Sequence, residues 1–281
     1  MADVCITEFT DPGCPWAYSA EPFRRRLSWL YGDGIEWKAR MVVLAEDPSD
    51  YEARGFTPEK QADALARIAH DHRMPIDTGE RPRMAATAPA CRAVVATRLH
   101  APERMRGLLR CLRVRNFSGE LLDDPATVDG AAGEAGIDPA ELARWIDDPA
   151  VEGELRDDMA AARAPIQAAR VLDHKLANWS GGRRYTCPSY EIVRASDGVR
   201  IAVPGFQPFA AYDVVLANLV PGVDRLKPPE SVEEVLRFTG TPLATQEVAV
   251  VCDIPFEEAR ERLGRVAQER HVGYDGFWTL N

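Results

Sequence analysis

The pattern of hydrophobic and polar residues predicts alternating strands and helices at the N-terminus. Residues 4–9 are largely apolar and β-branched and predict a strand, and residues 14–31 follow with apolar positions at helical spacing. Residues 35–41 alternate between apolar and charged side chains and continue into the apolar residues 42–44, which predicts a strand with one buried face. Strand, helix and strand in this order form a βαβ unit, so we expect the two strands to be parallel. Pro22 lies inside the predicted helix and should kink it.

A long helical segment follows, from residue 57 to residue 179. Alanine, leucine, arginine and glutamate dominate it, and apolar side chains recur at helical spacing, as at Leu142, Trp145 and Ile146. Prolines lie near the start of these stretches, where a missing backbone N–H costs little. We therefore expect an all-helical insertion of more than 100 residues, with helices that begin near Pro58, Pro89, Pro102, Pro139, Pro149 and Pro165.

The chain returns to strand-like patterns after residue 182. Residues 190–194 and 199–203 are separated by a turn that contains Asp197-Gly198, which is a strong hairpin signal. A helix over residues 209–219 follows and should cover the sheet.

Residues 223–281 form a distinct C-terminal segment that begins with a proline-containing linker. Ser231 precedes a capped helix, two further helical patterns follow, and the second of them extends from Phe256 to Arg270. An aromatic strand over residues 274–280 completes a pattern that resembles a winged helix–turn–helix. DNA binding is nevertheless disfavoured, because acidic side chains outnumber basic ones here and would face the phosphates. We expect a packing or dimerisation module instead.

Composition and charge narrow the class of protein. Hydrophobic residues make up 46% of the 281 residues, as in a globular protein, and the formal net charge of −10 argues against nucleic acid or an anionic membrane as a partner. No apolar run approaches the roughly 18 residues that span a bilayer, and the N-terminus lacks the basic and apolar regions of a signal peptide. We therefore expect a cytoplasmic protein.

Six cysteines are spread along the chain without a C-x-x-C pair. Their spacing indicates neither a secreted disulfide framework nor a zinc site, so no metal is expected. Cys91 and Cys111 lie among apolar helical positions and are expected to be structural thiols in the core.

Cys14 is different, because it lies at the predicted start of a helix, within residues 11–18 (DPGCPWAY). The N-terminus of a helix carries unpaired N–H groups and a partial positive charge, which stabilise an anion. A thiol at such a place commonly has its pKa lowered from about 8.5 toward about 3.5–7.5. Pro15 suits the first helical position, and Trp16 is expected to shape the adjacent groove. The alternative is a buried structural cysteine beside a proline.

Strand, turn, Cys14-Pro15-Trp16 and helix in this order resemble the active-site turn of DsbA-like thioredoxin-fold proteins, particularly the FrnE-like and 2-hydroxychromene-2-carboxylate isomerase-like branch. Disulfide-exchanging members carry C-P-W-C, whereas the fourth position here is Ala17, so the usual resolving thiol is absent. Isomerase and kappa-class glutathione transferase relatives carry a serine in the place of Cys14 and bind glutathione. The resemblance covers roughly residues 3–222.

The resemblance implies an α/β protein: a thioredoxin-like fold with a large all-helical insertion, followed by a small C-terminal winged-helix-like domain. The expected divisions are a βαβ unit over residues 1–56, the inserted helical domain over residues 57–182, the hairpin and helix over residues 183–222, and the C-terminal domain over residues 223–281.

The fold also implies a cis-proline before the third strand, opposite the helix-borne cysteine. Pro188 is the candidate, and Thr186 and Cys187 precede it. Cys187 is then expected to approach Cys14 and could form a disulfide with it in place of the missing C-x-x-C pair. Alternatively, Cys187 is only a small side chain at this position.

Arg81 and Arg83 flank a proline in a loop before a predicted helix. They could bind the carboxylate of a tripeptide-like thiol or of an acidic substrate, or they could simply be solvated. Nothing in the sequence places His174 near Cys14.

The leading hypothesis is a cytoplasmic thiol-disulfide oxidoreductase in which the Cys14 thiolate attacks a disulfide of a small molecule or a protein, and Cys187 or a low-molecular-weight thiol resolves the product. A second hypothesis is a transferase or isomerase that uses glutathione or mycothiol as co-substrate. A third is a non-catalytic thioredoxin-fold binding protein, and a homodimer is one assembly that the C-terminal segment would support. The sequence contains no metal-ligand set, phosphate loop or nucleotide motif, so no cofactor is expected beyond a small thiol.

Overall fold

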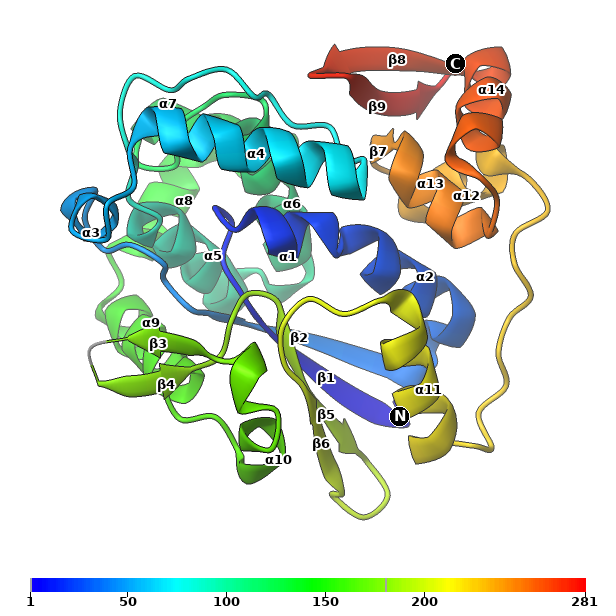
Figure 1. Cartoon of the computed structure of the whole chain (residues 1–281), viewed down its shortest axis with the longest axis horizontal. Coiled ribbons are helices and arrows are strands. Elements are labelled where there is room, and N and C mark those ends of the chain that lie inside the picture. Colours follow the sequence, from blue (N-terminus) through cyan, green and yellow to red (C-terminus); the bar gives the residue numbers. More distant parts are fainter. Residues whose placement is uncertain (1, 180) are drawn as a thin grey trace.

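A four-stranded mixed sheet lies at the centre of the computed structural model, which describes residues 2–179 and 181–281. Residue 1 of the expected N-terminal unit and residue 180 of the expected insertion lie outside the described residues. The strand order is β2-β1-β5-β6 (Figure 1). β1 is parallel to β2 and antiparallel to β5, and β5 is antiparallel to β6, so the predicted βαβ unit and hairpin are confirmed. The strands are β1 (Val4–Thr10), β2 (Ile35–Met41), β5 (Ser189–Arg194) and β6 (Arg200–Val203).

The connection from β1 to β2 differs from the single kinked helix that we predicted. It contains two helices, α1 (Pro15–Ser19) and α2 (Glu21–Tyr31), with a break at Ala20. The reason is Pro22, which lacks an N–H and would clash with the carbonyl of the preceding turn, so it occupies the second position of a new helix instead. A short 3-10 turn, η1 (Gly32–Gly34), leads into β2.

The predicted extension of β2 through residues 42–44 is wrong, because the strand ends at Met41. Val43 has a φ of 55°, which turns the chain away from the sheet. This turn brings the backbone of Leu44 to the carboxylate of Asp11.

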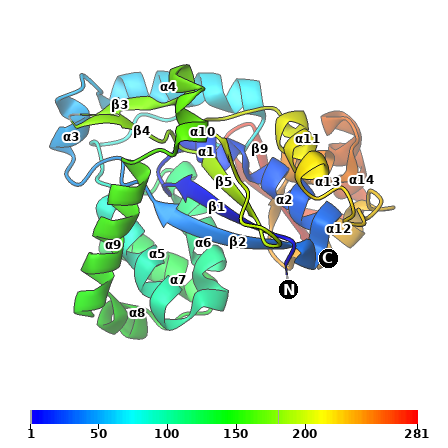
Figure 2. The ribbon, with the colours of Figure 1, turned by 90° about the horizontal axis from the view of Figure 1, so that it is seen from below.

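The segment between β2 and β5 is mainly helical, but it is not the all-helical insertion that we predicted, because it ends in a short pair of strands. Prolines occupy the first or second position of several of its helices, and Asp124, Asp138 and Asp148 cap three of them by accepting a backbone N–H two residues on. Helices α5–α9 gather on one side of the molecule, and α4 lies apart from them beside α1 (Figures 1 and 2). The elements are α3 (Ser49–Glu52), α4 (Pro58–His72), α5 (Ala88–His100), η2 (Pro102–Arg104), α6 (Met105–Phe117), α7 (Pro125–Glu134), α8 (Pro139–Ile146), α9 (Pro149–Ala162), α10 (Gln167–Arg170) and η3 (Asp173–Lys175).

A small two-stranded ribbon follows, which the sequence pattern did not predict. It consists of β3 (Ala177–Trp179) and β4 (Gly182–Arg184), paired antiparallel. The chain then enters β5, and α11 (Phe209–Leu219), predicted at the same residues, packs through Tyr212 and Leu216 into the core that contains Ile6 and Ile192.

The C-terminal segment contains three helices and a three-stranded sheet of order β7-β9-β8. Ser231 caps its first helix as predicted, by accepting the N–H of Glu234. The prediction of a last helix through Arg270 is wrong, because that helix ends at Val266 and the following residues pair with the aromatic final strand. The elements are α12 (Val232–Thr239), β7 (Leu243–Ala244), α13 (Thr245–Cys252), α14 (Phe256–Val266), β8 (Ala267–Val272) and β9 (Asp275–Leu280).

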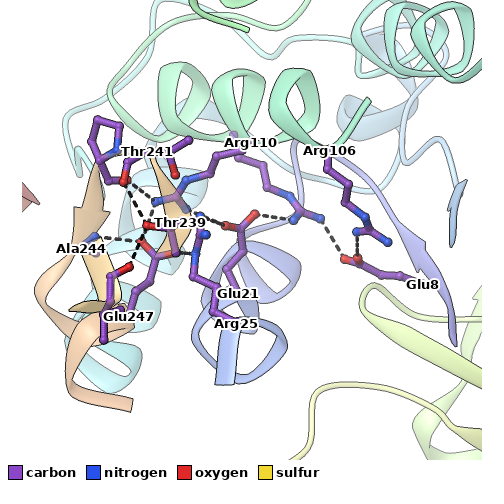
Figure 3. A network of polar contacts seen from close by, with 12 residues as sticks. Glu8, Glu21, Arg25, Arg106, Arg110, Thr239, Thr241, Ala244 and Glu247 are labelled. Atoms are coloured by element: carbon purple, nitrogen blue, oxygen red, sulfur yellow. Dashed lines mark hydrogen bonds and ion pairs between the residues drawn. The ribbon is translucent and has the colours of Figure 1, made fainter. Parts of the chain in front are cut away.

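A network of buried ion pairs connects the C-terminal segment to the sheet (Figure 3). Glu21 on α2 accepts hydrogen bonds from Arg110 and Arg113 on α6, at 2.7 and 2.6 Å. Arg110 also donates to Glu247 on α13 at 2.6 Å, and Arg113 donates to Glu8 on β1 at 3.1 Å. Burial alone would raise the pKa of Glu8, but the adjacent arginines, Arg113 foremost, lower it to about 2. The network therefore holds four separate elements through charges that are paired away from water.

Every helix within residues 2–179 and 181–281 is too short or too polar to cross a lipid bilayer.

Candidate functional site

The turn before α1 is built around the buried carboxylate of Asp11. One of its oxygens accepts the N–H of Gly13 at 2.7 Å, and the other accepts the N–H of Leu44 and the hydroxyl of Thr87 at 2.9 and 2.8 Å. A Cβ on Gly13 would lie 2.7 Å from the Thr87 methyl group, so only glycine fits this close approach. The carboxylate thereby ties the end of β1 to the turn after β2 and to the start of α5.

Cys14 is the residue that this turn presents. It occupies the cap position before Pro15, with extended backbone angles, and its amide N–H bonds to the Asp11 carbonyl at 3.2 Å. Its carbonyl accepts the first helical hydrogen bond, from Tyr18, at 3.0 Å. The side chain is 5% exposed and therefore meets the solvent only through the cleft described below.

Cys187 lies directly against Cys14. The Cys14 thiol is 3.3 Å from the carbonyl oxygen of Cys187, to which it donates when it is protonated. The peptide bond between Cys187 and Pro188 is cis. Both cysteines are free thiols, and two residues 173 positions apart in sequence therefore meet at one place.

The two thiols differ in their acidity. Burial raises the pKa of Cys14, but hydrogen bonds from the Cys187 thiol and from the backbone N–H groups of Ala17 and Trp16 outweigh burial, so the net pKa is below that of an ordinary thiol. Burial and the adjacent Cys14 thiolate hold the pKa of Cys187 well above the ordinary value. When the pair carries one negative charge, that charge therefore resides on Cys14.

Both thiols open into a cleft of about 640 Å³. Its floor is formed by the turn before α1 and by the residues before β5, and one wall is the face of α4 that carries Leu65 and Ile68. Trp16 stands at the rim, 42% exposed, and its ring meets the edges of His72 and Phe206 at centroid distances of 5.2 and 5.6 Å. The cleft has the size of a site for a small ligand.

The structure brings most of the predicted site residues to this cleft. Besides the two cysteines, its lining includes Pro15, Trp16, Thr186 and Arg81. Pro188 follows Cys187 in the sequence and is buried.

The two predicted arginines have different surroundings. Arg81 is 8% exposed, and its guanidinium donates to the carbonyl groups of Asn116 and Glu120 at the end of α6. Arg83 lies outside the cleft lining and forms an ion pair with Asp123, with N–O distances of 2.7 and 2.8 Å. Arg83 is therefore not brought together with Cys14.

Several other lining residues were not predicted from the sequence. Tyr51, Arg54 and Phe56 come from α3 and the loop after it, and His174 and Lys175 come from η3 before the unexpected ribbon. These residues are distant from Cys14 in sequence, and only the packing of α4 and the ribbon around the cleft brings them close.

The other cysteines lack the features of Cys14. Burial raises the pKa of Cys91 well above the ordinary value, and burial raises that of Cys111 and of Cys252 to about 11. Burial also raises the pKa of Cys5, on β1. In the part of the chain that the structure describes, no group of three metal-ligating side chains converges on a common point.

Comparison with known proteins shows which family and which solved structures the chain resembles. A family model described as a DSBA-like thioredoxin domain matches residues 5–165. The ClpXP adapter protein SpxH of Halalkalibacterium halodurans is 25% identical over 288 residues, which cover 97% of this chain and 87% of that protein.

Solved structures with the same fold extend over about four fifths of the chain. The probable DsbA oxidoreductase SCO1869 from Streptomyces coelicolor superposes with a TM-score of 0.56 at 20% identity, over 80% of this chain and 93% of that one. The cytosolic disulfide reductase DsbM from Pseudomonas aeruginosa superposes with a TM-score of 0.54 at 16% identity, over 76% and 99%. A structure of the same protein with GSH gives 0.51 at 16% identity, over 75% and 98%.

Proposed function

This chain belongs to the family of DSBA-like thioredoxin domains, and we propose that it is a thiol-disulfide oxidoreductase of the DsbA/FrnE-like type with Cys14 as its nucleophile. The observation that carries the proposal is the Cys14 thiol itself. It opens into the cleft at the start of α1, and its pKa is lowered by the hydrogen bonds of Cys187, Ala17 and Trp16 despite burial. A thiolate is the form of cysteine that attacks a disulfide.

The proposed reaction is one exchange of a sulfur–sulfur bond. The Cys14 thiolate attacks one sulfur of a substrate disulfide, a bond forms between the two sulfurs, and the substrate bond breaks. The leaving thiolate takes a proton from the solvent or from Cys187, whose raised pKa keeps it protonated beside the attacked sulfur. Cys14 is oxidised and one half of the substrate is reduced.

The second step needs a thiol that Ala17 does not provide. Cys187 could attack the mixed disulfide from its position against Cys14, which would release the substrate and leave a Cys14–Cys187 bond. A low-molecular-weight thiol such as glutathione or mycothiol could do the same from the cleft. The GSH bound to the DsbM relative favours including this route.

Reduction of insulin disulfides, followed with and without glutathione, tests the proposal. We expect wild-type chain to turn over with the added thiol, Cys14→Ser to be inactive, and Cys91→Ser to match wild type as a control. A Cys187→Ser variant that still turns over with glutathione would assign resolution to the small thiol. Wild-type activity in Cys14→Ser would contradict the proposal.

Mass mapping after mild oxidation tests the Cys14–Cys187 bond separately. Digestion without reductant should yield the two peptides joined through Cys14 and Cys187. Cys14 recovered free or as a small-thiol adduct, with Cys187 reduced, would exclude the bond and leave the small-thiol route.

A second candidate function is that of a protein-binding adapter. It is favoured by the SpxH relative, whose similarity covers 97% of this chain and therefore includes the C-terminal segment beyond the matched family domain. An adapter needs the fold and its surfaces but no reactive thiol. Calorimetric titration against assembled ClpXP separates the two functions, because adapter binding should persist in Cys14→Ser.

Several finer features belong to the same proposal. We place the chain in the FrnE-like branch on the strength of its C-P-W-A turn, and we regard residues 223–281 as a winged-helix-like domain for packing or dimerisation. The divisions at residues 56, 182 and 222 remain predictions. The DsbM relative, described as cytosolic, favours a cytoplasmic site of action on thiol- or disulfide-containing substrates.

A further inference from the structure

The cleft has a charge opposite to that of the whole molecule. The chain carries a formal net charge of −10. Yet the residues that line the described cleft include arginines and a lysine, and no aspartate or glutamate is among them. Apart from the buried Arg81, its cationic side chains are Arg54, Lys175 and Arg184, which are all at least partly exposed.

These three side chains are not neutralised by the fold. In the part of the chain that the structure describes, no carboxylate lies within ion-pair distance of any of them. Arg184 donates to the carbonyl oxygen of Tyr185, at 2.6 Å. Among the described residues, most arginines pair with carboxylates, and Arg54 and Arg184 belong to a minority that do not, a minority that also includes residues outside the cleft such as Arg67 and Arg144.

The ribbon of β3 and β4 explains how this arrangement arises. Successive residues of a strand point to opposite faces. Arg183 points to one side and forms an ion pair with Asp173, at an N–O distance of 2.9 Å, whereas the next residue, Arg184, lines the cleft. Asp173, which lies two residues before Lys175, is thus already paired outside the cleft with Arg183, and the charge of Arg184 is left for a ligand in the cleft.

The field of these cations extends to the reactive thiols and to a neighbouring arginine. The positive charge of Arg184 acts against burial and against Cys14 to lower the pKa of Cys187. Burial and then the adjacent charge of Arg184 lower the pKa of Arg163, and Arg54 contributes in the same direction. Arg54 and Arg184 thus act on the same region, and a bound anion would reduce the repulsion between such like charges.

We propose that the cleft selects anionic thiols or disulfides of about tripeptide size, whose carboxylates bind Arg54, Lys175 and Arg184 while their sulfur lies at Cys14. This inference rests on the proposed function only for the reaction of the sulfur. It assigns the recognition of charge to the loop after α3, to η3 and to the ribbon, rather than to Arg81 and Arg83. Glutathione fits this chemistry, whereas a neutral sugar-based thiol such as mycothiol does not use these cations.

The first experiment measures the charge selectivity at Cys14 without any redox step. Iodoacetate and iodoacetamide are similar in size and differ in charge, so the ratio of their alkylation rates at Cys14 reports the local field. We expect the ratio to be several-fold higher than for free cysteine and to fall about threefold to tenfold in Arg184→Gln and in Arg54→Gln/Lys175→Gln. The ratio, unlike either rate alone, is insensitive to a change in the thiol pKa.

Arg183→Gln is the matched control, because it removes an arginine from the same strand that is paired and outside the cleft. It should leave the ratio unchanged. A ratio equal to that of free cysteine in the wild type, or an equal fall in Arg183→Gln, would overturn the inference.

The second experiment identifies the source of the anion. Formation of the Cys14 mixed disulfide is followed with oxidised glutathione, with neutral 2-hydroxyethyl disulfide, with cationic cystamine, and with glutamate-flanked and lysine-flanked cystine peptides. Preference for oxidised glutathione supports a small anionic thiol. Preference for only the glutamate-flanked peptide contradicts the assigned size and indicates an acidic protein segment.

The two proposals can fail separately. Equal rates with all the probes would overturn the inference while the oxidoreductase function stands. A high iodoacetate ratio without any mixed disulfide would support the anion site and contradict the oxidoreductase function.

Discussion

Cys14 and Cys187 have identical side chains but different roles, because their surroundings differ. Cys14 receives hydrogen bonds from the first turn of α1 and from Cys187, which favour its anion. Cys187 has no such donors and faces an anion, which favours its neutral form. The asymmetry is that of a nucleophile beside a proton donor.

Replacing Cys187 should make Cys14 less acidic. Cys187→Ala removes the side-chain hydrogen bond that stabilises the Cys14 thiolate, so the pKa of Cys14 should rise and its alkylation at pH 6–7 should slow by about threefold to tenfold. Cys187→Ser keeps a donor and should restore most of the rate. Equal slowing in both variants would show that the sulfur of Cys187, and not its hydrogen bond, matters.

Asp11 acts on Cys14 in the opposite direction. Its carboxylate raises the pKa of Cys14 and accepts hydrogen bonds from Gly13, Leu44 and Thr87. Asp11→Asn should therefore lower the pKa of Cys14 while it destabilises the fold by about 1–3 kcal/mol, the usual cost of a buried group that loses its partners. Urea unfolding and the pH dependence of alkylation check the two effects, and a raised pKa would contradict this account.

Among the helices and strands, the features that depend on a few adjacent residues were predicted correctly from the sequence. Pro58, Pro139 and Pro149 mark helix starts, and Asp197-Gly198 marks the turn of the β5–β6 hairpin, because each acts through its own backbone. The β3–β4 ribbon has strands of three residues, too short for a periodic signal. The start of β8 continues a helical pattern in the sequence and becomes a strand only through its pairing with β9. Cys14 was predicted from its place at a helix start and Cys187 from the family resemblance, but the basic lining of the cleft depends on tertiary packing and could not be predicted.

The turn between β8 and β9 supports the wall of the cleft. Gly273 has a φ of 64°, and a Cβ there would lie 2.2 Å from the carbonyl oxygen of Ile76. Tyr274 beside it donates its hydroxyl to the carbonyl of Ala69 on α4 at 2.5 Å. The C-terminal segment thus holds the end of the helix that covers Cys14.

Gly273→Ala should detach this turn from α4. We expect the free energy of unfolding to fall by more than about 2 kcal/mol, because backbone strain and a backbone clash add. We also expect faster hydrogen exchange in α4. Gly264→Ala is the control, since it lies on α14 with nothing within 4 Å of its Cβ and should stabilise by about 0.5–1 kcal/mol. Unchanged exchange in α4 after Gly273→Ala would contradict the supporting role.

At the scale of the whole molecule, the buried ion pairs join the C-terminal segment to the sheet as one unit. Glu8 and Glu21 come from the N-terminal strand and helix, Arg110 and Arg113 from the insertion, and Glu247 from the C-terminal segment. Buried ion pairs of this kind fix how the elements are placed relative to one another, even where apolar side chains would stabilise the fold to the same extent. The sequence did not reveal the network, because its members are spread over more than 200 residues.

Arg113→Met should destabilise the chain by about 3–5 kcal/mol, because it leaves two buried carboxylates with fewer partners. Arg156→Met is the control, since the pair of Arg156 with Glu152 is exposed and should contribute at most about 1 kcal/mol. Urea unfolding at pH 7 measures both, and similar losses in the two variants would contradict the importance of the buried network.

The same network predicts how stability depends on pH. The pKa of Glu8 is lowered from 4.5 to about 2 in the folded chain, so the folded state binds its proton less readily than the unfolded state does. The stabilisation of the fold by the ionised Glu8 carboxylate is therefore complete above about pH 4.5, and it is lost as the pH falls toward 2. Thermal melts between pH 6 and pH 2 should show this loss in wild type, and an Arg113→Met variant with the same slope would contradict the assignment.

Measuring the pKa of Cys14 tests most directly whether this cysteine is the activated nucleophile. The rate of iodoacetamide alkylation is measured against pH on the reduced full chain, with peptide mapping to follow each of the six cysteines separately. We predict that Cys14 titrates below about 8.5, the value of a free thiol, and is the fastest of the six at neutral pH. A Cys14 pKa at or above about 8.5, or faster alkylation of another cysteine at neutral pH, would contradict its role as the activated nucleophile.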